Sequence, residues 1–247
     1  MAYKIIKKLI QFLVPGKVKL FIAQEKINDF QRKYEMTSLS FSQEGEDLIL
    51  ERFLEKKEKG FYVDIGAHDP KRFSNTALFY AKGWNGLNVD PLPGVMDKFK
   101  ILRPNDINLE IGVSLVEQEL DYFMFNEPAL NTFSKEEAQI KEGQGVYKII
   151  QERKIKTYPL NAILDTCIKP GTQIDFMTID VEGLDLDVLK SNDWERFRPR
   201  LLLVENLKKQ SIERFIDDSE MFKFLKGQDY SFIAKTLNTL FFKDNIS

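Results

Sequence analysis

The stretch FYVDIGAHDP, residues 61–70, is an apolar run that ends abruptly in a polar loop. The carboxylate of Asp64 comes just before the end of the run, Gly66 follows two positions later, and His68 is the single histidine of the chain. A short apolar run that stops at a glycine is typical of a buried strand, and the glycine allows a tight turn and the close approach of a ligand. The stretch therefore predicts a strand whose end leads into a binding loop.

Strand and helix patterns alternate through the rest of the chain. Buried strands are continuous apolar runs, whereas helices show an amphipathic period and often end in glycine. This alternation predicts an α/β fold, a mostly parallel sheet with helices on both faces. The expected strands are 61–67, 85–91, 105–114, 174–183 and 199–206, with further strand or strand-to-helix pieces at 119–126 and 155–164. The expected helices are 40–60 (with Ser42 as N-cap), 74–83, 94–100, 184–197 and 212–227, before a closing β-hairpin at 230–244.

Composition limits the class of protein. The 247 residues suit one α/β domain with a short arm, and we place the arm at residues 1–39 and the domain at residues 40–247. Because 36 Lys and Arg nearly balance 38 Asp and Glu, the net charge of −2 gives no reason to expect a nucleic-acid partner. A single cysteine, Cys167, excludes an intrachain disulfide and favours a reducing, cytoplasmic location.

The arm begins with a basic amphipathic pattern. Ile5, Leu9 and Phe12 recur at helical spacing, and lysines stand among them. Such a helix either rests on a membrane surface or packs against the domain or a second subunit, so residues 1–20 are the candidate segment for peripheral membrane or subunit contact. No apolar run approaches the roughly 20 residues that a membrane-spanning helix needs.

Carboxylates stand at the ends of several predicted strands. Asp64 and Asp90 end two neighbouring strands, Asp180 and Glu182 end a third, and Glu205 ends a fourth. Ligands of open α/β sheets bind outside the carboxyl ends of the strands, so these side chains are expected at one edge of the sheet. Buried carboxylates are costly unless they are paired or hydrogen-bonded, which indicates a site at this edge.

The loop after the first strand lacks the phosphate-binding patterns. Gly66 is followed by AHDP, which is neither the GxGxxG fingerprint nor a P-loop. Asp90 lies 26 residues after Asp64, at the end of the next strand, where a carboxylate can accept hydrogen bonds from both ribose hydroxyls of a nucleoside. A phosphate-free, positively charged nucleoside fits a site of carboxylates and backbone amides. These features favour S-adenosylmethionine as the cofactor.

Several stretches, in order and spacing, resemble the FkbM-type methyltransferases, which use S-adenosylmethionine. The resemblance runs from about residue 41 to residue 242. It implies a class I methyltransferase fold, a Rossmann-like sheet of seven mostly parallel strands whose last strand is antiparallel and belongs to the C-terminal hairpin. It also implies methyl transfer to an oxygen, on a sugar or on a polysaccharide or glycolipid precursor. The stretches that carry it are SQEGEDLIL, FYVDIGAHDPKRFSNTALFYAKGWNGLNVDP, RPNDINLEIGVS, LNTFS, IDFMTIDVEGLDLDVLKSNDW and TLNTLFF.

The resemblance further implies a set of cofactor-binding residues. Where many methyltransferases have a third glycine in the first loop, this chain has His68, which leaves the path of the loop open. The implied contacts are Asp64, Gly66 and Ala67 on the amino-acid and sulfonium side, Gln43 and Asn75 at the methionine end, Asp90 on the ribose, and Gly112, Val113 and Ser114 beside the adenine.

Three residues are candidates for catalysis. His68 titrates near neutral pH and suits a general base, or else it makes a structural hydrogen bond in its loop. Asp180 and Glu182 can share a proton or hold a divalent cation that orients two sugar hydroxyls. In the alternative, Asp180 binds the cofactor or caps the following helix. Because the sequence shows no complete ligand set, we assign no metal ligand.

Two other functions stay open at this point. A nucleotide-dependent oxidoreductase would share the fold, although the missing phosphate fingerprint argues against it. A non-catalytic nucleoside-binding protein would need the same carboxylates without a base. For the enzyme, the expected acceptor is a small molecule or a glycan. The segment NTFS, residues 131–134, offers hydroxyls and an amide to such a polyhydroxy substrate.

Overall fold

The computed structural model describes residues 25, 29, 33, 38–55, 57–207 and 211–246. The predicted arm, residues 1–39, therefore lies almost entirely outside the described residues, and with it the segment 1–20 that we considered for membrane or subunit contact. Over the described ranges, no helix combines the length and the apolar character that crossing a membrane requires.

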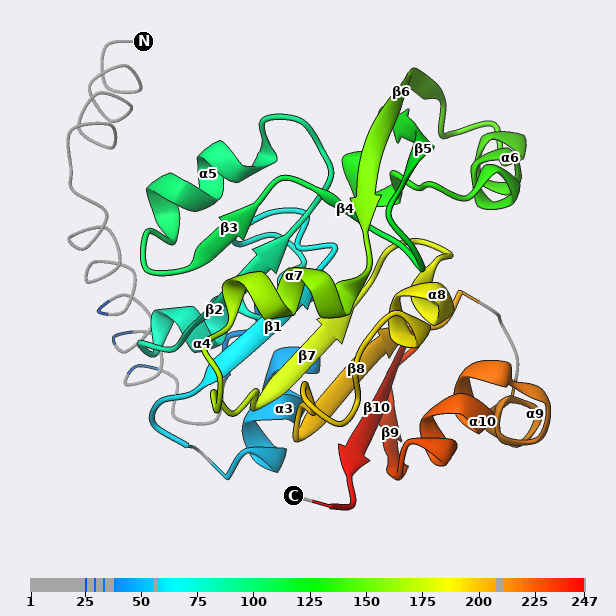
Figure 1. The fold of residues 1–247 in the computed structure, drawn as a ribbon. Coiled ribbons are helices and arrows are strands. Elements are labelled where there is room, and N and C mark those ends of the chain that lie inside the picture. The colour runs from blue at the N-terminus through cyan, green and yellow to red at the C-terminus, as the bar shows by residue number, and fades with distance from the viewer. Residues whose placement is uncertain are drawn as a thin grey trace, which may run out of the picture.

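A seven-stranded sheet forms the centre of the molecule (Figure 1). Its spatial order is β3-β2-β1-β7-β8-β10-β9, and β10 runs antiparallel to both of its neighbours. This confirms the predicted class I methyltransferase sheet with an antiparallel strand in a C-terminal hairpin. The strands are β1 (Phe61–Ile65), β2 (Asn85–Val89), β3 (Ile107–Leu109), β7 (Phe176–Ile179), β8 (Leu201–Glu205), β9 (Tyr230–Lys235) and β10 (Thr239–Asp244).

Helices cover both faces of this sheet. One face packs on α7 (Leu160–Cys167), α8 (Asp185–Lys190), α9 (Ile212–Asp218) and α10 (Glu220–Gly227). The other face packs on α3 (Glu46–Phe53) and α4 (Ala77–Ala81). A further helix, α5 (Val95–Leu102), buries Val95, Met96 and Phe99 against Ala67 of the first loop. Because β1 and β7 are covered on both sides, their residues are almost all buried, as their continuous apolar sequences predict.

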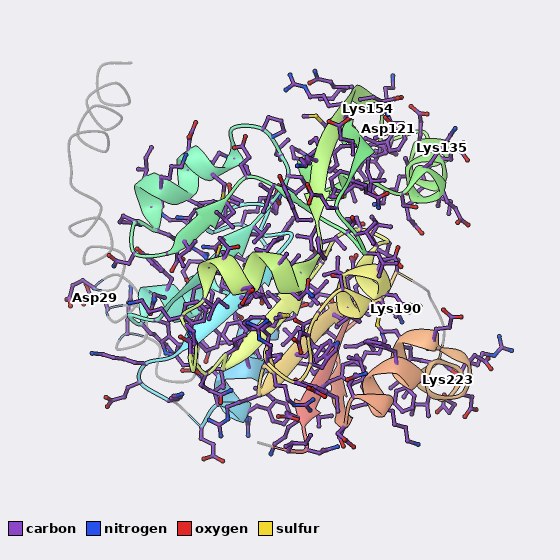
Figure 2. The ribbon with its side chains drawn as sticks, viewed as in Figure 1. Asp29, Asp121, Lys135, Lys154, Lys190 and Lys223 are labelled. Carbon is purple, nitrogen blue, oxygen red and sulfur yellow. The ribbon has the colours of Figure 1, made fainter. Side chains whose placement is uncertain are left out.

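A second, three-stranded sheet lies outside the main one, with the order β4-β6-β5. It consists of β4 (Gly112–Val113), β5 (Gln118–Phe125) and β6 (Ile149–Tyr158), with the 3-10 helix η1 (Pro128–Leu130) and α6 (Lys135–Gly143) between β5 and β6. Asp121 and Lys154 pair across β5 and β6 with a 3.0 Å ion pair at the outer part of this sheet (Figure 2). We call β4–β6, η1 and α6 the insert.

Several predicted boundaries were wrong. The helices expected to end at residues 60 and 197 end at Phe53 and Lys190. The strand expected at 105–114 is two strands, because the chain leaves the main sheet after Leu109 and joins the insert at Gly112. The first helix begins at Glu46. Its N-cap is Gly45, whose φ of 85° lies in the left-handed region, so Ser42 is not the N-cap. The helix expected at 212–227 is two helices, because Ser219 leaves the helical conformation and its hydroxyl caps α10.

Candidate active site

A cavity of about 580 Å³ opens at the carboxyl ends of the central strands. Its floor includes Ile65 at the end of β1, Val89 at the end of β2 and Glu205 at the end of β8. This is the position where open α/β sheets bind their ligands, and the volume lies within the range of small-molecule sites. The insert supplies the opposite wall, including Tyr122, Asn131, Phe133, Lys141 and Tyr147.

The structure brings eight of the predicted site residues to this cavity. The four others, Asp64, Ala67, Gly112 and Ser114, do not line it. Ser114 makes hydrogen bonds inside the insert, to Thr157 and to the Val116 carbonyl. The eight lining residues are Gln43, Gly66, His68, Asn75, Asp90, Val113, Asp180 and Glu182.

Gly66 joins the first loop to the end of β7. Its φ is 89°, and a Cβ atom at this position would lie 1.7 Å from the carbonyl oxygen of Asp180. The two strand ends therefore approach so closely that only glycine fits between them. Gly66 also lines the cavity, so a ligand at this glycine stays a prediction, while on the Cβ side its close neighbour is the backbone of Asp180.

Asp90 holds the first loop from the side of β2. Its Oδ2 atom accepts a 2.8 Å hydrogen bond from the backbone N–H of His68, and its Oδ1 atom accepts one of 2.8 Å from Leu92. Burial nevertheless raises the pKa of Asp90 to about 6, against these two hydrogen bonds, which lower it. Each carboxylate oxygen keeps a lone pair for a further donor in the cavity.

Asp64 belongs to a buried network behind the loop. Its carboxylate accepts a 2.7 Å hydrogen bond from Thr76, and burial raises its pKa to about 6. The fully buried guanidinium of Arg103 donates to Thr76, to Ser74 and, at 2.6 Å, to the carbonyl of Pro70. Arg103 thereby fixes both ends of the segment 70–76 that carries Asn75 to the cavity, where Asn75 donates to Thr178 at 3.0 Å.

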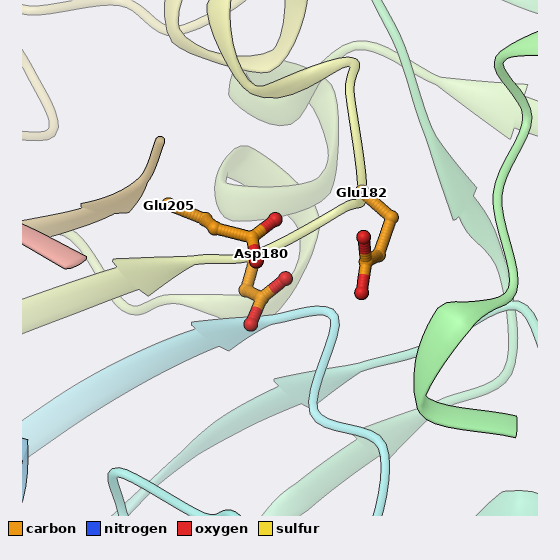
Figure 3. A group of neighbouring side chains, drawn as sticks. All are labelled: Asp180, Glu182 and Glu205. Atoms are coloured by element: carbon orange, nitrogen blue, oxygen red, sulfur yellow. The ribbon is translucent and has the colours of Figure 1, made fainter. Parts of the chain in front are cut away.

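A cluster of three carboxylates lies beside the Gly66 contact. Asp180 and Glu182 follow β7, Glu205 ends β8, and one oxygen of each lies within 4.8 Å of the others (Figure 3). Burial is the main cause that raises the pKa of Asp180, Glu182 and Glu205. The Glu182 charge adds to the rise at Asp180, and the Asp180 charge adds to it at Glu205. We call Asp180, Glu182 and Glu205 the carboxylate cluster.

The loop that carries Asp180 and Glu182 is not an extended strand. Glu182 has a φ of 55°, and Asp185 accepts backbone hydrogen bonds from Val181 and Gly183 at 3.1 Å each. Asp185 therefore closes the turn before α8. The sequence analysis gave capping of this helix as an alternative role for Asp180. Burial raises the pKa of Asp185 to about 7.

The insert is attached to this loop by buried polar contacts. Lys141 of α6 donates a 2.6 Å hydrogen bond to Glu182 Oε2, and both side chains are buried. Thr132 donates a 2.7 Å hydrogen bond to the Glu182 carbonyl. Asn131 and Phe133 of the segment NTFS line the cavity, where the sequence predicts the acceptor. Lys141 also lines it but is not predicted, because in the sequence it resembles any surface lysine of a polar helix.

His68 lies at the rim of the cavity in a second polar group. Its φ is 51°, and its ring stacks on Phe73, with the ring centroids 6.5 Å apart. Arg72 Nη1 lies 3.3 Å from His68 Nε2, so Nε2 is the acceptor of this contact. Burial and the Arg72 charge lower the pKa of His68, which is therefore neutral at pH 7. Arg72 also binds both carboxylate oxygens of Glu127 in the insert, at 2.8 and 3.1 Å.

The remaining wall joins segments from the two ends of the domain. The Glu46 carboxylate accepts hydrogen bonds from the hydroxyls of Thr236 (3.3 Å) and Thr239 (3.2 Å). The Asn238 N–H donates to Glu44 at 3.1 Å. Gln43, Glu44 and Asn238 all line the cavity, so the turn of the closing hairpin and the segment before α3 form one continuous wall.

Comparison with known proteins shows the family to which the chain belongs. Residues 64–232 match the family described as "Methyltransferase FkbM domain". This match covers more than half of the chain, and the chain belongs to this family of S-adenosylmethionine-dependent methyltransferases. The family assignment confirms the resemblance seen in the sequence. No curated protein matches the chain.

Three solved structures show distant similarity to the chain. A TehB-like SAM-dependent methyltransferase from Corynebacterium glutamicum has 9% identity and a TM-score of 0.41, over 91% of this chain and 99% of its own. A putative RNA methyltransferase from Pyrococcus horikoshii has 12% identity and a TM-score of 0.41, over 82% and 84%. A putative O-methyltransferase from Klebsiella pneumoniae has 11% identity and a TM-score of 0.40, over 97% and 95%.

Proposed function

We propose that the chain transfers a methyl group from S-adenosylmethionine to a hydroxyl oxygen of a sugar, either a small molecule or part of a glycan or glycolipid precursor. The observation that carries the proposal is the position of Asp180. Its side chain is exposed to the cavity, while its backbone touches Gly66 of the predicted cofactor loop. A group that acts on the acceptor thus lies next to the loop that would hold the methyl donor.

The residues on one side of the cavity fit the cofactor. Asp90 offers carboxylate lone pairs for the ribose, Val113 and Ile111 offer apolar surface for the adenine, and Gln43 and Asn75 offer amides for the methionine end. When bound, S-adenosylmethionine supplies a methyl group activated by its sulfonium. Carboxylates and amides without any phosphate-binding loop suit such a cation.

The residues on the other side fit a polyhydroxy acceptor. Tyr122 and Phe133 of the insert pack with ring centroids 4.7 Å apart, and Tyr147, Asn131 and Gln144 add polar groups to the same wall. Aromatic faces combined with a few hydrogen-bonding groups are common in sites for small polar ligands. In this arrangement Asp180 accepts a hydrogen bond from the acceptor hydroxyl and orients the oxygen toward the methyl group.

Two groups on the cavity wall can take the hydroxyl proton, Asp180 and His68. Since His68 is neutral at pH 7, its unprotonated nitrogen is a competent acceptor, but that nitrogen already receives the Arg72 N–H. Among the described residues, no cationic side chain donates a hydrogen bond to Asp180. We therefore assign the orientation of the hydroxyl to Asp180 and test the proton transfer with both residues.

The test compares Asp180→Asn and His68→Gln in a methyl-transfer assay against sugar and glycan acceptors. Loss of a general base lowers kcat by about 10²–10⁴-fold. We expect this loss for Asp180→Asn, with little change for His68→Gln. The reverse result would move the base to His68, and full activity in both variants would contradict the assignment. A thermal shift with S-adenosylhomocysteine but none with NAD separates the proposal from an oxidoreductase.

A further inference from the structure

We propose that the carboxylate cluster binds a divalent cation, and that this cation holds two neighbouring oxygen atoms of the acceptor. The second part rests on the proposed function, whereas the binding of the cation does not. Carboxylate oxygens are the ligands that Mg²⁺, Ca²⁺ and Mn²⁺ prefer in proteins. The three side chains come from two adjacent strand ends and point toward one another (Figure 3).

The spacing of the cluster matches one ion. Two oxygens on the same ion are separated by no more than twice the metal–oxygen distance, about 4.2 Å for Mg²⁺ and about 4.6–5.2 Å for Ca²⁺. One oxygen from each of Asp180, Glu182 and Glu205 lies within 4.8 Å of the other two. The cluster is therefore compact enough for its three carboxylates to share one ion after small rotations of the side chains.

Glu205 independently indicates a missing ligand. Its Oε2 atom is buried and receives no N–H or O–H from the described residues. The carboxylate of Glu205 lies at hydrogen-bond distance from that of Asp180, a second acceptor, so this contact requires a proton or a cation between the two groups. A buried carboxylate oxygen without a donor costs free energy that native structures rarely leave uncompensated. Because Glu205 lies on the cavity floor beside Asp180, a cation between the two carboxylates would supply the missing partner.

The charge of the site also fits a doubly charged ion. With a cation bound, the three carboxylates would be ionised and carry −3, and the Lys141 ammonium, 2.6 Å from Glu182, would contribute +1, which leaves −2. Of the two Glu182 carboxylate oxygens, only Oε2 accepts a hydrogen bond from Lys141, so Oε1 is left for a cation. Three protein ligands leave half of an octahedral shell open to the cavity, and two hydroxyls on adjacent sugar carbons can fill neighbouring positions there.

The competing account is a proton shared between Asp180 and Glu205, which would also neutralise this pair without any metal. The two accounts differ in one direct measurement. A shared proton predicts no cation binding, whereas the metal site predicts one saturable site. If the metal site exists, Asp180 holds the acceptor hydroxyl through the cation and not by a direct hydrogen bond.

The experiment is a titration of the full-length chain with Mn²⁺, in which free Mn²⁺ is followed by electron paramagnetic resonance. We expect a single saturable site from which Mg²⁺ or Ca²⁺ displaces Mn²⁺. Glu205→Gln and Asp180→Asn should weaken the affinity by about tenfold or more. Asp187→Asn is the control: it removes a charge from the first turn of α8, outside the carboxylate cluster, and should leave the affinity for Mn²⁺ unchanged. Thermal unfolding of each variant checks that it is folded.

The absence of saturable binding, or binding that Glu205→Gln leaves intact, would overturn the proposal in favour of the shared proton. A parallel titration with S-adenosylhomocysteine keeps the two proposals apart. Cofactor binding without Mn²⁺ binding contradicts only the metal site. Mn²⁺ binding without cofactor binding contradicts the proposed function and leaves the metal site standing.

Discussion

Lys141 and Glu182 form a buried ion pair of 2.6 Å between the insert and the loop after β7. We predict that Lys141→Met lowers the free energy of unfolding by about 3 kcal/mol, because it leaves the Glu182 carboxylate buried without its cation. Urea unfolding at neutral pH measures this change.

The double variant Lys141→Met with Glu182→Gln is the control for this prediction. It removes the buried charge as well as its partner, so we expect it to regain at least half of the lost stability. A single variant within about 0.5 kcal/mol of the wild type would show that the pair does not hold the insert in place.

Gly66 and Gly83 form a matched pair for testing the contact between the first loop and β7. Their φ values are 89° and 90°, but a Cβ at Gly66 meets the Asp180 carbonyl, whereas a Cβ at Gly83 meets nothing within 4 Å. We expect Gly83→Ala to cost about 1 kcal/mol of stability from backbone strain alone. Gly66→Ala should cost clearly more and abolish methyl transfer, because Asp180 must move. Equal costs in chemical denaturation would contradict the close contact.

Asp90 makes the affinity for the cofactor depend on pH. Burial raises its pKa to about 6, so the carboxylate that would accept the ribose hydroxyls is ionised above this pH and protonated below it. We predict that the affinity for S-adenosylhomocysteine falls by about tenfold for each pH unit below 6. Calorimetric titrations from pH 8 to pH 5 measure the profile, with Asp97→Asn, on the exposed side of α5, as control. An affinity independent of pH would exclude Asp90 from the cofactor site.

Because the pKa of Asp64 is raised in the folded protein, its contribution to the free energy of unfolding falls as the pH rises. A carboxylate whose pKa is lowered in the folded protein would show the opposite dependence. The pKa of Asp64 in the folded protein is about 6, above its ordinary value of 3.8, because burial disfavours the charge. The folded state thus binds more protons than the unfolded state between these values, and the stability that Asp64 contributes is lost as pH rises through 6. The shift corresponds to about 3 kcal/mol. We expect Asp64→Asn to gain stability over the wild type between pH 4 and pH 7, measured by denaturation at each pH. A pH-independent difference would contradict the raised pKa.

Much of the fold could be predicted because its strands are buried on both faces. The runs FYVDI, LNV and FMTI contain few polar positions, and the glycines and acids that end them mark their carboxyl ends. The division of 105–114 between two sheets could not be predicted, because a strand pattern reports burial and not the identity of its neighbour. The break at Ser219 could have been predicted, because a serine followed by an acidic residue is a helix N-cap signal, but apolar residues on both sides favoured one continuous helix.

The residues of the candidate site could be predicted mainly where they follow strand ends. In the insert, Val113 and the segment 131–134 were predicted, but Tyr122, Lys141 and Tyr147 were missed. Asp90, Asp180 and Glu182 follow buried strands, so the topology itself carries them to one edge. Asp64 shows the limit of this reasoning, because successive side chains of a strand alternate between faces and its carboxylate turns toward Thr76 behind the sheet. Lys141 is brought to Glu182 by the folding of the insert, which no local pattern records.

The hydrogen bonds from Thr236, Asn238 and Thr239 to Glu44 and Glu46 connect positions at least 190 residues apart. A ribosome releases Glu44 and Glu46 early, while their partners emerge only when translation of the domain is nearly complete. Throughout elongation, the nascent polypeptide therefore lacks one side of its cavity. Any gain in stability from a ligand in this cavity therefore comes only after the closing hairpin has been synthesised.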